Sequence, residues 1–298
     1  MRRIRMLGEL VTILAAVCWA VGASLYKKGL VNMNPLMLNL FRSISVTLYG
    51  FLVLYLLGKW SLLYELDTVT LAYIGVSSLL VLLVGDTFYF IGLRSVGVAK
   101  TVPIAYSYSI FVAIISAGFL REPVTAPILL GTAAVVSGVW LVAARAENEA
   151  SKQKTSKLGI LTSLGTALCW AGGLTLFKII LATVDPFVLG SVRMLFLLPV
   201  LEVFTVLPLG ARSSVGRLTR YNILMMFLSG VVSLGVGDTF LYIGLENAEA
   251  NVVAPLASTT PLFAAIIAIL FLKESVSKRV VAGTLLVTAG TMLLTLGK

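Results

Sequence analysis

One stretch of this sequence occurs twice. Residues 84–93 read VGDTFYFIGL and residues 236–245 read VGDTFLYIGL, so eight of ten positions are identical across a separation of 152 residues. Each copy carries an aspartate within an otherwise apolar run. A repeat of this length indicates an internal duplication, and a duplicated chain usually forms its working site between the two copies.

The composition indicates that the duplicated unit belongs in a membrane. The 298 residues are 59% hydrophobic and only 12% charged, with a mean hydropathy of +1.02, whereas soluble domains carry roughly 25% charged residues. Apolar runs of about 20 residues, long enough to cross a bilayer as helices, recur without the alternation of a β-barrel. The sequence predicts an all-α integral protein of the cell membrane with ten transmembrane helices, over residues 9–30, 35–57, 69–93, 98–119, 124–144, 157–180, 186–208, 221–245, 250–271 and 275–296.

The repeat extends over the whole chain. Residues 151 or 152 positions apart match in both halves: Lys27 and Lys178, Pro35 and Pro186, Arg42 and Arg193, Pro103 and Pro255, Glu122 and Glu274, and Gly131 and Gly283. Each unit then has five helices, and because five is odd, the second unit must enter the membrane from the opposite side. We expect two inverted five-helix repeats, over 1–145 and 157–298, joined by a polar linker at 146–156.

The sequence offers little for chemistry that needs a metal or a cofactor. It contains no histidine, which removes the commonest metal ligand and proton shuttle. Cys18 and Cys169 occupy matching places in predicted membrane helices, where packing is a better interpretation than a disulfide. We therefore expect no cofactor and no metal. The helix after the basic N-terminus recurs internally, which argues against a cleaved signal peptide.

The two repeated aspartates, Asp86 and Asp238, are the first candidates for a site. A charge at the centre of a membrane helix costs on the order of 2.5 to 3.5 kcal/mol, so it needs a reason. Helical spacing puts Asp86 on one face with Leu82 and Phe90, toward the protein interior. The pair would bind a cation, a proton or a substrate amine; alternatively, each aspartate is the buried partner of a base or accepts hydrogen bonds from hydroxyls.

Three further charged residues within predicted helices are candidates for the site. Arg42 and Arg193 lie about two turns into their predicted helices and could bind a carboxylate or phosphate. An interpretation in which the arginine side chains instead extend to the membrane interface is slightly favoured. Glu202 has Phe51 at the matching position, so it breaks the symmetry. It is either the partner of an arginine or a residue that gives the two halves different roles.

Polar and aromatic residues complete a candidate cavity. Tyr106 and Ser107 in the first half correspond to Ser258 and Thr259 in the second, so a site between them would have unlike sides. Trp19 and Trp170 could stack on a substrate, but ordinary packing is the commoner role.

Two repeated prolines, Pro103 and Pro255, lie close to predicted helix starts. Proline costs little in the first turn of a helix. We therefore expect first-turn prolines rather than functional kinks.

Several of these features together resemble one transporter family. A Cys-Trp pair in the first helix, an arginine early in the second and Leu-x-Glu before a last helix with Gly131 and Gly138 look like the EamA-type transporters of the drug/metabolite transporter superfamily. The last element reads FLREPVTAPILLGTAAVVSGVWL at 119–141 and FLKESVSKRVVAGTLLVTAGTML at 271–293. The resemblance implies ten helices, alternating access, and relatives that export amino acids, metabolites or drugs. The Gly-Asp-Thr segment lies outside that pattern, so the resemblance does not identify the substrate.

We therefore interpret the chain as a secondary transporter, and no enzyme, that moves a small amino-acid-like or drug-like molecule through the lipid bilayer, with a proton or sodium ion as a possible coupling partner. The alternative from another class is an intramembrane aspartyl protease that uses Asp86 and Asp238, since residues 235–238 read Gly-Val-Gly-Asp. A channel or scramblase is a third possibility. Nucleic acid is not an expected partner, because the net charge of +10 is scattered over short loops.

The orientation of the chain has two opposed predictions. Loops on the side opposite the termini hold twice as many Lys and Arg as the termini's own side. The positive-inside rule therefore puts both termini outside. The family resemblance implies termini in the cytoplasm.

Overall fold

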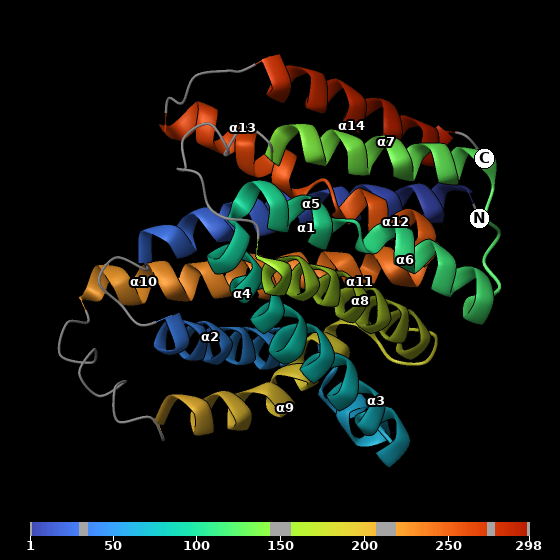
Figure 1. The fold of residues 1–298 in the computed structure, drawn as a ribbon. Coiled ribbons are helices and arrows are strands. Elements are labelled where there is room, and N and C mark those ends of the chain that lie inside the picture. The colour runs from blue at the N-terminus through green and yellow to red at the C-terminus, as the bar shows by residue number, and fades with distance from the viewer. Residues whose placement is uncertain (1, 30–34, 144–155, 207–218, 273–277, 297–298) are drawn as a thin grey trace.

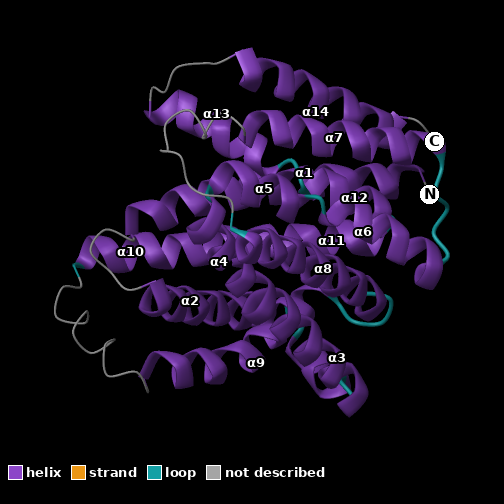
Figure 2. Ribbon diagram, viewed as in Figure 1, coloured by secondary structure: helices purple, strands orange, loops and turns teal. Residues whose placement is uncertain are grey.

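The computed structural model describes residues 2–29, 35–143, 156–206, 219–272 and 278–296, and within these ranges the regular structure is helical (Figure 2). The helices are α1 (Arg2–Gly29), α2 (Pro35–Leu56), η1 (Trp60–Glu65), α3 (Thr68–Ser78), η2 (Leu79–Gly85), α4 (Asp86–Val96), α5 (Val98–Tyr106), α6 (Tyr108–Ile115), η3 (Ser116–Leu120), α7 (Ala126–Ala143), α8 (Lys157–Ile180), α9 (Pro186–Val206), α10 (Arg220–Ser229), η6 (Gly230–Gly237), α11 (Asp238–Asn247), α12 (Ala250–Ala257), α13 (Thr260–Leu272) and α14 (Lys278–Leu296). Within the described residues each of the ten predicted ranges is mainly helical, whereas nearly all of the predicted linker lies outside the described residues.

Seven helical stretches in the described part of the chain are long and apolar enough to cross a membrane: Arg5–Leu25, Thr68–Leu93, Lys100–Leu120, Ala126–Ala143, Lys157–Ile180, Arg220–Asn247 and Ala250–Ile267. Leu40–Leu56 and Pro186–Val200 are shorter apolar helices. The number of ten crossings therefore stays a prediction. Apolar side chains such as Leu48, Leu130 and Leu161 are exposed on the outer surface, as lipid contact requires.

A wide helical turn precedes each repeated aspartate. The π-helical segment η2 runs directly into Asp86 at the start of α4, and η6 runs directly into Asp238 at the start of α11. π-Helical turns are rare and frequent at functional sites, because they rotate the following side chains relative to a regular α-helix. The duplication therefore conserves a backbone irregularity as well as a motif.

The prediction for the prolines was wrong. Pro103 and Pro255 lie inside α5 and α12, and each helix ends within three residues of its proline. An interior proline removes a backbone hydrogen bond and clashes with the preceding turn, which favours ending the helix. The helical stretches α5–α6 and α12–α13 are consequently interrupted beside the centre of the molecule.

The two halves interlock through their first helices. The helix α1 packs against α10, η6 and α11 of the second half, while α8 packs against α3, η2 and α4 of the first half. The helices α7 and α14 lie side by side at the outer edge (Figure 1). Their glycines allow close approach: a Cβ on Gly138 would lie 2.7 Å from the carbonyl oxygen of Gly283.

Charged side chains close the helix ends around the connection from α11 to α12. Lys178 donates hydrogen bonds to carbonyl oxygens there, including that of Ala248 at 2.8 Å. The carboxylate of Glu122 accepts the backbone N–H groups of Ala250 at 2.8 Å and Asn251 at 3.0 Å. An ammonium at a helix C-terminus and a carboxylate at an N-terminus complement the helix dipoles, so these contacts hold that end of the bundle together.

Candidate functional site

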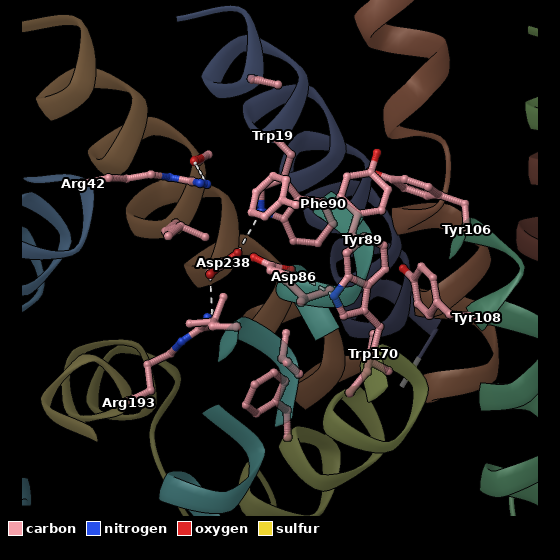
Figure 3. Close-up of a pocket in the computed structure, with 18 residues that line it drawn as sticks. Trp19, Arg42, Asp86, Tyr89, Phe90, Tyr106, Tyr108, Trp170, Arg193 and Asp238 are labelled. Carbon is pink, nitrogen blue, oxygen red and sulfur yellow. Dashed lines mark hydrogen bonds and ion pairs between the residues drawn. The ribbon is translucent and has the colours of Figure 1, made fainter. Parts of the chain in front are cut away.

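A cavity of about 290 Å³ lies between the two halves and is lined by 18 side chains (Figure 3). The lining residues come from α1, α2, η2, α4, α5 and α6 of the first half, and from α8, α9, η6 and α11 of the second. Both repeated aspartates, both arginines and both tryptophans of the sequence analysis line this cavity. Its volume is at the lower end of the range for small-molecule sites, roughly 300 to 1,000 Å³.

Each aspartate accepts a hydrogen bond from a tryptophan of the opposite half. Trp19 Nε1 donates to Asp238 Oδ1 at 2.8 Å, and Trp170 Nε1 donates to Asp86 Oδ1 at 3.1 Å. The glycine before each aspartate makes room for the indole, since a Cβ on Gly85 would lie 2.9 Å from Trp170. The repeated Cys-Trp and Gly-Asp motifs are therefore partners across the interface, and the expectation of plain tryptophan packing missed this hydrogen bond.

The two aspartates differ in their ion pairs. Arg193 Nη1 lies 3.0 Å from Asp238 Oδ2, and the side chains are only 2% and 5% exposed. The matching arginine, Arg42, instead donates to Ser233 Oγ at 2.8 Å. Among the described residues Asp86 takes part in no ion pair, and Trp170 is its hydrogen-bond donor.

The cavity has an arginine side and an aromatic side. In Figure 3 both arginines approach from one side, the rings lie on the other, and the two aspartates lie between them. The ring of Trp170 is at the centre of the aromatic side, with centroid distances of 5.3 Å to Tyr89, 5.6 Å to Tyr106 and 6.0 Å to Tyr108. The hydroxyl of Tyr108 donates to the carbonyl oxygen of Ala254 at 3.1 Å, which fixes that ring across the interface.

Matching positions of the two halves differ in exposure around the cavity. Phe90 is 42% exposed, whereas its counterpart Tyr242 is fully buried. Ala23 is exposed, whereas its counterpart Leu174 is 4% exposed. Arg42 and Asp86 are likewise more exposed than Arg193 and Asp238. The cavity is thus open where first-half residues line it and sealed where second-half residues line it.

Most of the other predicted site residues lie outside the cavity lining. Of the remaining candidates, Tyr106 lines the cavity, whereas Ser107, Ser258 and Thr259 do not. Their hydroxyls donate to backbone carbonyl oxygens of the preceding turn, at 2.6 Å from Ser107 to Ile104 and 2.6 Å from Thr259 to Leu256. Glu202 belongs to α9, and its side chain lies outside the described residues.

Sequence reasoning also missed lining residues. Ser233, Tyr89 and Phe177 contribute to the cavity without having been candidates. Of the predicted stripe on the third helix, Leu82, Asp86 and Phe90 do line it. A helical period of 3.6 residues places Tyr89 beside that stripe, so the sequence could have identified Tyr89 as a lining residue. The period does not show which other helix packs against this face.

The geometry does not favour a protease. An aspartyl dyad needs two carboxyl groups that share one proton. Here each carboxylate is bonded to an indole, and Asp238 is also paired with Arg193. No group of three or more His, Cys, Asp or Glu that could hold a metal ion occurs within the described ranges.

Comparison with known proteins identifies the family. The model of the EamA-like transporter family matches residues 6–144 and 157–296, so the match occurs twice and covers nearly the whole chain. The chain belongs to the EamA-like transporter family. It is 28% identical over 298 residues to a protein of Archaeoglobus fulgidus described as an uncharacterized transporter, covering 98% of this chain and 99% of that one.

A solved crystal structure has the same fold. It superposes with a TM-score of 0.80 at 16% sequence identity, covering 97% of this chain and 96% of the other. With the family match and several apolar helices, the protein is a multi-pass integral membrane protein and a membrane transporter. A small-molecule substrate and a lipid bilayer are implied by that family.

Proposed function

We propose that this EamA-like protein is a secondary transporter that moves a small amino-acid-like or drug-like metabolite by alternating access through the central cavity. In this proposal the chain crosses the membrane ten times, as two inverted five-helix units over 1–145 and 157–298 joined by the segment 146–156. The cavity between the units is the substrate site.

The unequal exposure of matching positions is the observation that carries the proposal. Alternating access requires a site that is open to one side of the membrane and sealed from the other. The cavity is open beside Ala23 and Phe90 and sealed beside Leu174, and Tyr242, the counterpart of Phe90, is buried outside the cavity lining. Because the two halves share one ancestral sequence, exchange of their conformations would open the sealed part and seal the open part.

The charges around the cavity limit the substrate. Arg42, Arg193, Asp86 and Asp238 sum to no net charge when all four are ionised. A net charge within a low-dielectric site is costly, so a neutral or zwitterionic substrate fits best. An amino-acid-like molecule has this charge and a suitable size for 290 Å³. A coupling proton or sodium ion would use Asp86, which takes part in no ion pair among the described residues.

Cysteine labelling at a matched pair of positions tests the exchange. In a background with Cys18→Ala and Cys169→Ala, the variants Ala23→Cys and Leu174→Cys are reconstituted separately and exposed to an impermeant maleimide. We expect rapid labelling of Ala23→Cys from one side only and slow labelling of Leu174→Cys. A substrate gradient that favours the opposite state should slow the first and speed the second, from the other side.

The matched pair also gives the control. A general loosening of the protein would speed labelling at both positions. Rates that change in the same direction, or that never change in any gradient, would contradict alternating access and favour a channel-like pathway.

A further inference from the structure

Asp86, which forms no ion pair among the described residues, lies beside the aromatic side of the cavity. We propose that Asp86 and the rings around Trp170 form a subsite for a positively charged nitrogen of the substrate, an ammonium group. This inference rests on the proposed function, since it names the substrate group that the transporter recognises. The site is composed of Asp86, Trp170, Tyr89, Tyr106 and Tyr108, all of which line the cavity.

The charge of Asp86 is the first argument. The protein supplies a cation to Asp238, where Arg193 lies 3.0 Å from the carboxylate. At the matching place in the first half, Arg42 donates a hydrogen bond to Ser233, a hydroxyl that exists only in the second half because position 81 is valine. Arg42 lines the same cavity, but among the described residues no base lies within ion-pair distance of Asp86, so a cationic group of a ligand can pair with this carboxylate directly.

The rings are the second argument, and they are also confined to one half. Tyr89, Tyr106 and Tyr108 correspond to Leu241, Ser258 and Thr260 in the second half. The three tyrosines surround Trp170 with centroid distances of 5.3 to 6.0 Å, and the Trp170 indole donates to Asp86. Aromatic faces attract organic cations within about 6 Å of the ring centroid. The carboxylate that forms no ion pair among the described residues therefore lies beside these rings.

The geometry orients the rest of the molecule. The two arginines lie on the side opposite the rings (Figure 3). An ammonium near Asp86 would place an attached carboxylate toward Arg42, which is more exposed to the cavity than Arg193. The ammonium group could belong to a simple amine or to a zwitterion. A series of ligands that share one phenylalkyl skeleton separates these two kinds of substrate.

The experiment is thermal unfolding of the full-length protein in detergent with four ligands at about 10 mM: phenethylamine, phenylalanine, 2-phenylethanol and 3-phenylpropionate. A ligand that binds the native state raises its apparent stability in proportion to the logarithm of its concentration. We expect a rise with phenethylamine, phenylalanine or both, and none with the alcohol or the acid. A rise with phenylalanine alone assigns a zwitterion, and a rise with both assigns the ammonium as sufficient.

Three variants test the residues. Asp86→Asn should weaken binding of the amines at least about tenfold, by loss of the charged partner. Tyr106→Leu, which removes a ring, should weaken binding, whereas Tyr106→Phe, which keeps it, should not. Equal stabilisation by the alcohol and the amine, stabilisation by the acid alone, or no rise with either amine would overturn the proposal.

The ligand series in the unmodified protein keeps the test valid even if Asp86→Asn does not fold. Its result is also separate from the proposed function, because binding in detergent needs no flux. Amine binding without any change in labelling of Ala23→Cys and Leu174→Cys would refute alternating access alone. Altered labelling without amine binding would refute this subsite alone.

Discussion

Neutralising the two repeated aspartates one at a time should have unequal effects on stability. Asp238→Asn removes the partner of Arg193, whose side chain is 2% exposed and lies 3.0 Å from the carboxylate. The asparagine oxygen can still accept from Trp19 Nε1, so the main change is a buried guanidinium without its counter-ion. Asp86→Asn keeps an acceptor for Trp170 Nε1 and breaks no described ion pair.

The expected magnitudes follow from this difference. Removing one partner of a buried ion pair costs about 3 to 5 kcal/mol, because the remaining charge is left uncompensated. For a chain of this size that corresponds to a lower unfolding temperature by on the order of 10 °C. For Asp86→Asn we expect a change within about 1 kcal/mol, since the exchange removes a charge and keeps a hydrogen bond of similar geometry.

The assay is thermal unfolding in one detergent, followed by the helical circular dichroism signal, for the parent protein and both variants without ligand. The double variant Arg193→Gln with Asp238→Asn is the control: it removes the orphaned charge, so it should recover most of the loss. Equal destabilisation by Asp86→Asn and Asp238→Asn would refute the asymmetry, as would a double variant no more stable than Asp238→Asn.

Three further predictions concern transport, packing and orientation. Asp86→Asn should abolish or uncouple uptake in reconstituted vesicles while the protein stays folded; undiminished uptake with the same pH dependence would contradict a role in binding or coupling. Gly138→Ala should destabilise by about 1 to 3 kcal/mol in thermal unfolding, because its Cβ would lie 2.7 Å from the Gly283 carbonyl oxygen, whereas Gly118→Ala, with nothing within 4 Å, should be neutral. Alkaline phosphatase fused after Lys298 should be active if loop charges decide the orientation, and inactive, with a fluorescent green fluorescent protein fusion, if the termini are cytoplasmic as the resemblance implies.

The sequence predicted the helices and most of the charged centre for a physical reason. Membrane crossing requires long apolar runs, and a charge inside one of them is costly, so Asp86, Asp238, Arg42 and Arg193 were conspicuous. Their convergence on one cavity follows from duplication, because both halves contribute the same helices to the interface. The prediction that the arginine side chains extend to the membrane interface was wrong for Arg193, which is buried against Asp238.

The hydroxyl-bearing candidates could not be judged in the same way. Ser107 and Thr259 stand in polar stretches, yet their hydroxyls donate to carbonyl oxygens three residues earlier in the chain. A serine or threonine in a helix can satisfy itself locally, so its presence in an apolar segment costs little and reports little about a ligand. A carboxylate or guanidinium has no such local solution, which is why charge was the more reliable signal.

The most informative positions of this duplicated chain are those where the repeats differ. Identity between the halves marks what both need for packing, such as the glycine that admits an indole beside each aspartate. Ser233 against Val81 and Tyr89 against Leu241 are unremarkable differences in the sequence, yet all four residues line one cavity. Only the fold shows that these differences surround the same two carboxylates. Because identical Gly-Asp motifs thereby acquire different neighbours, the two carboxylates need not have the same role: Asp238 is paired with Arg193, and Asp86 is the one that we propose binds a ligand.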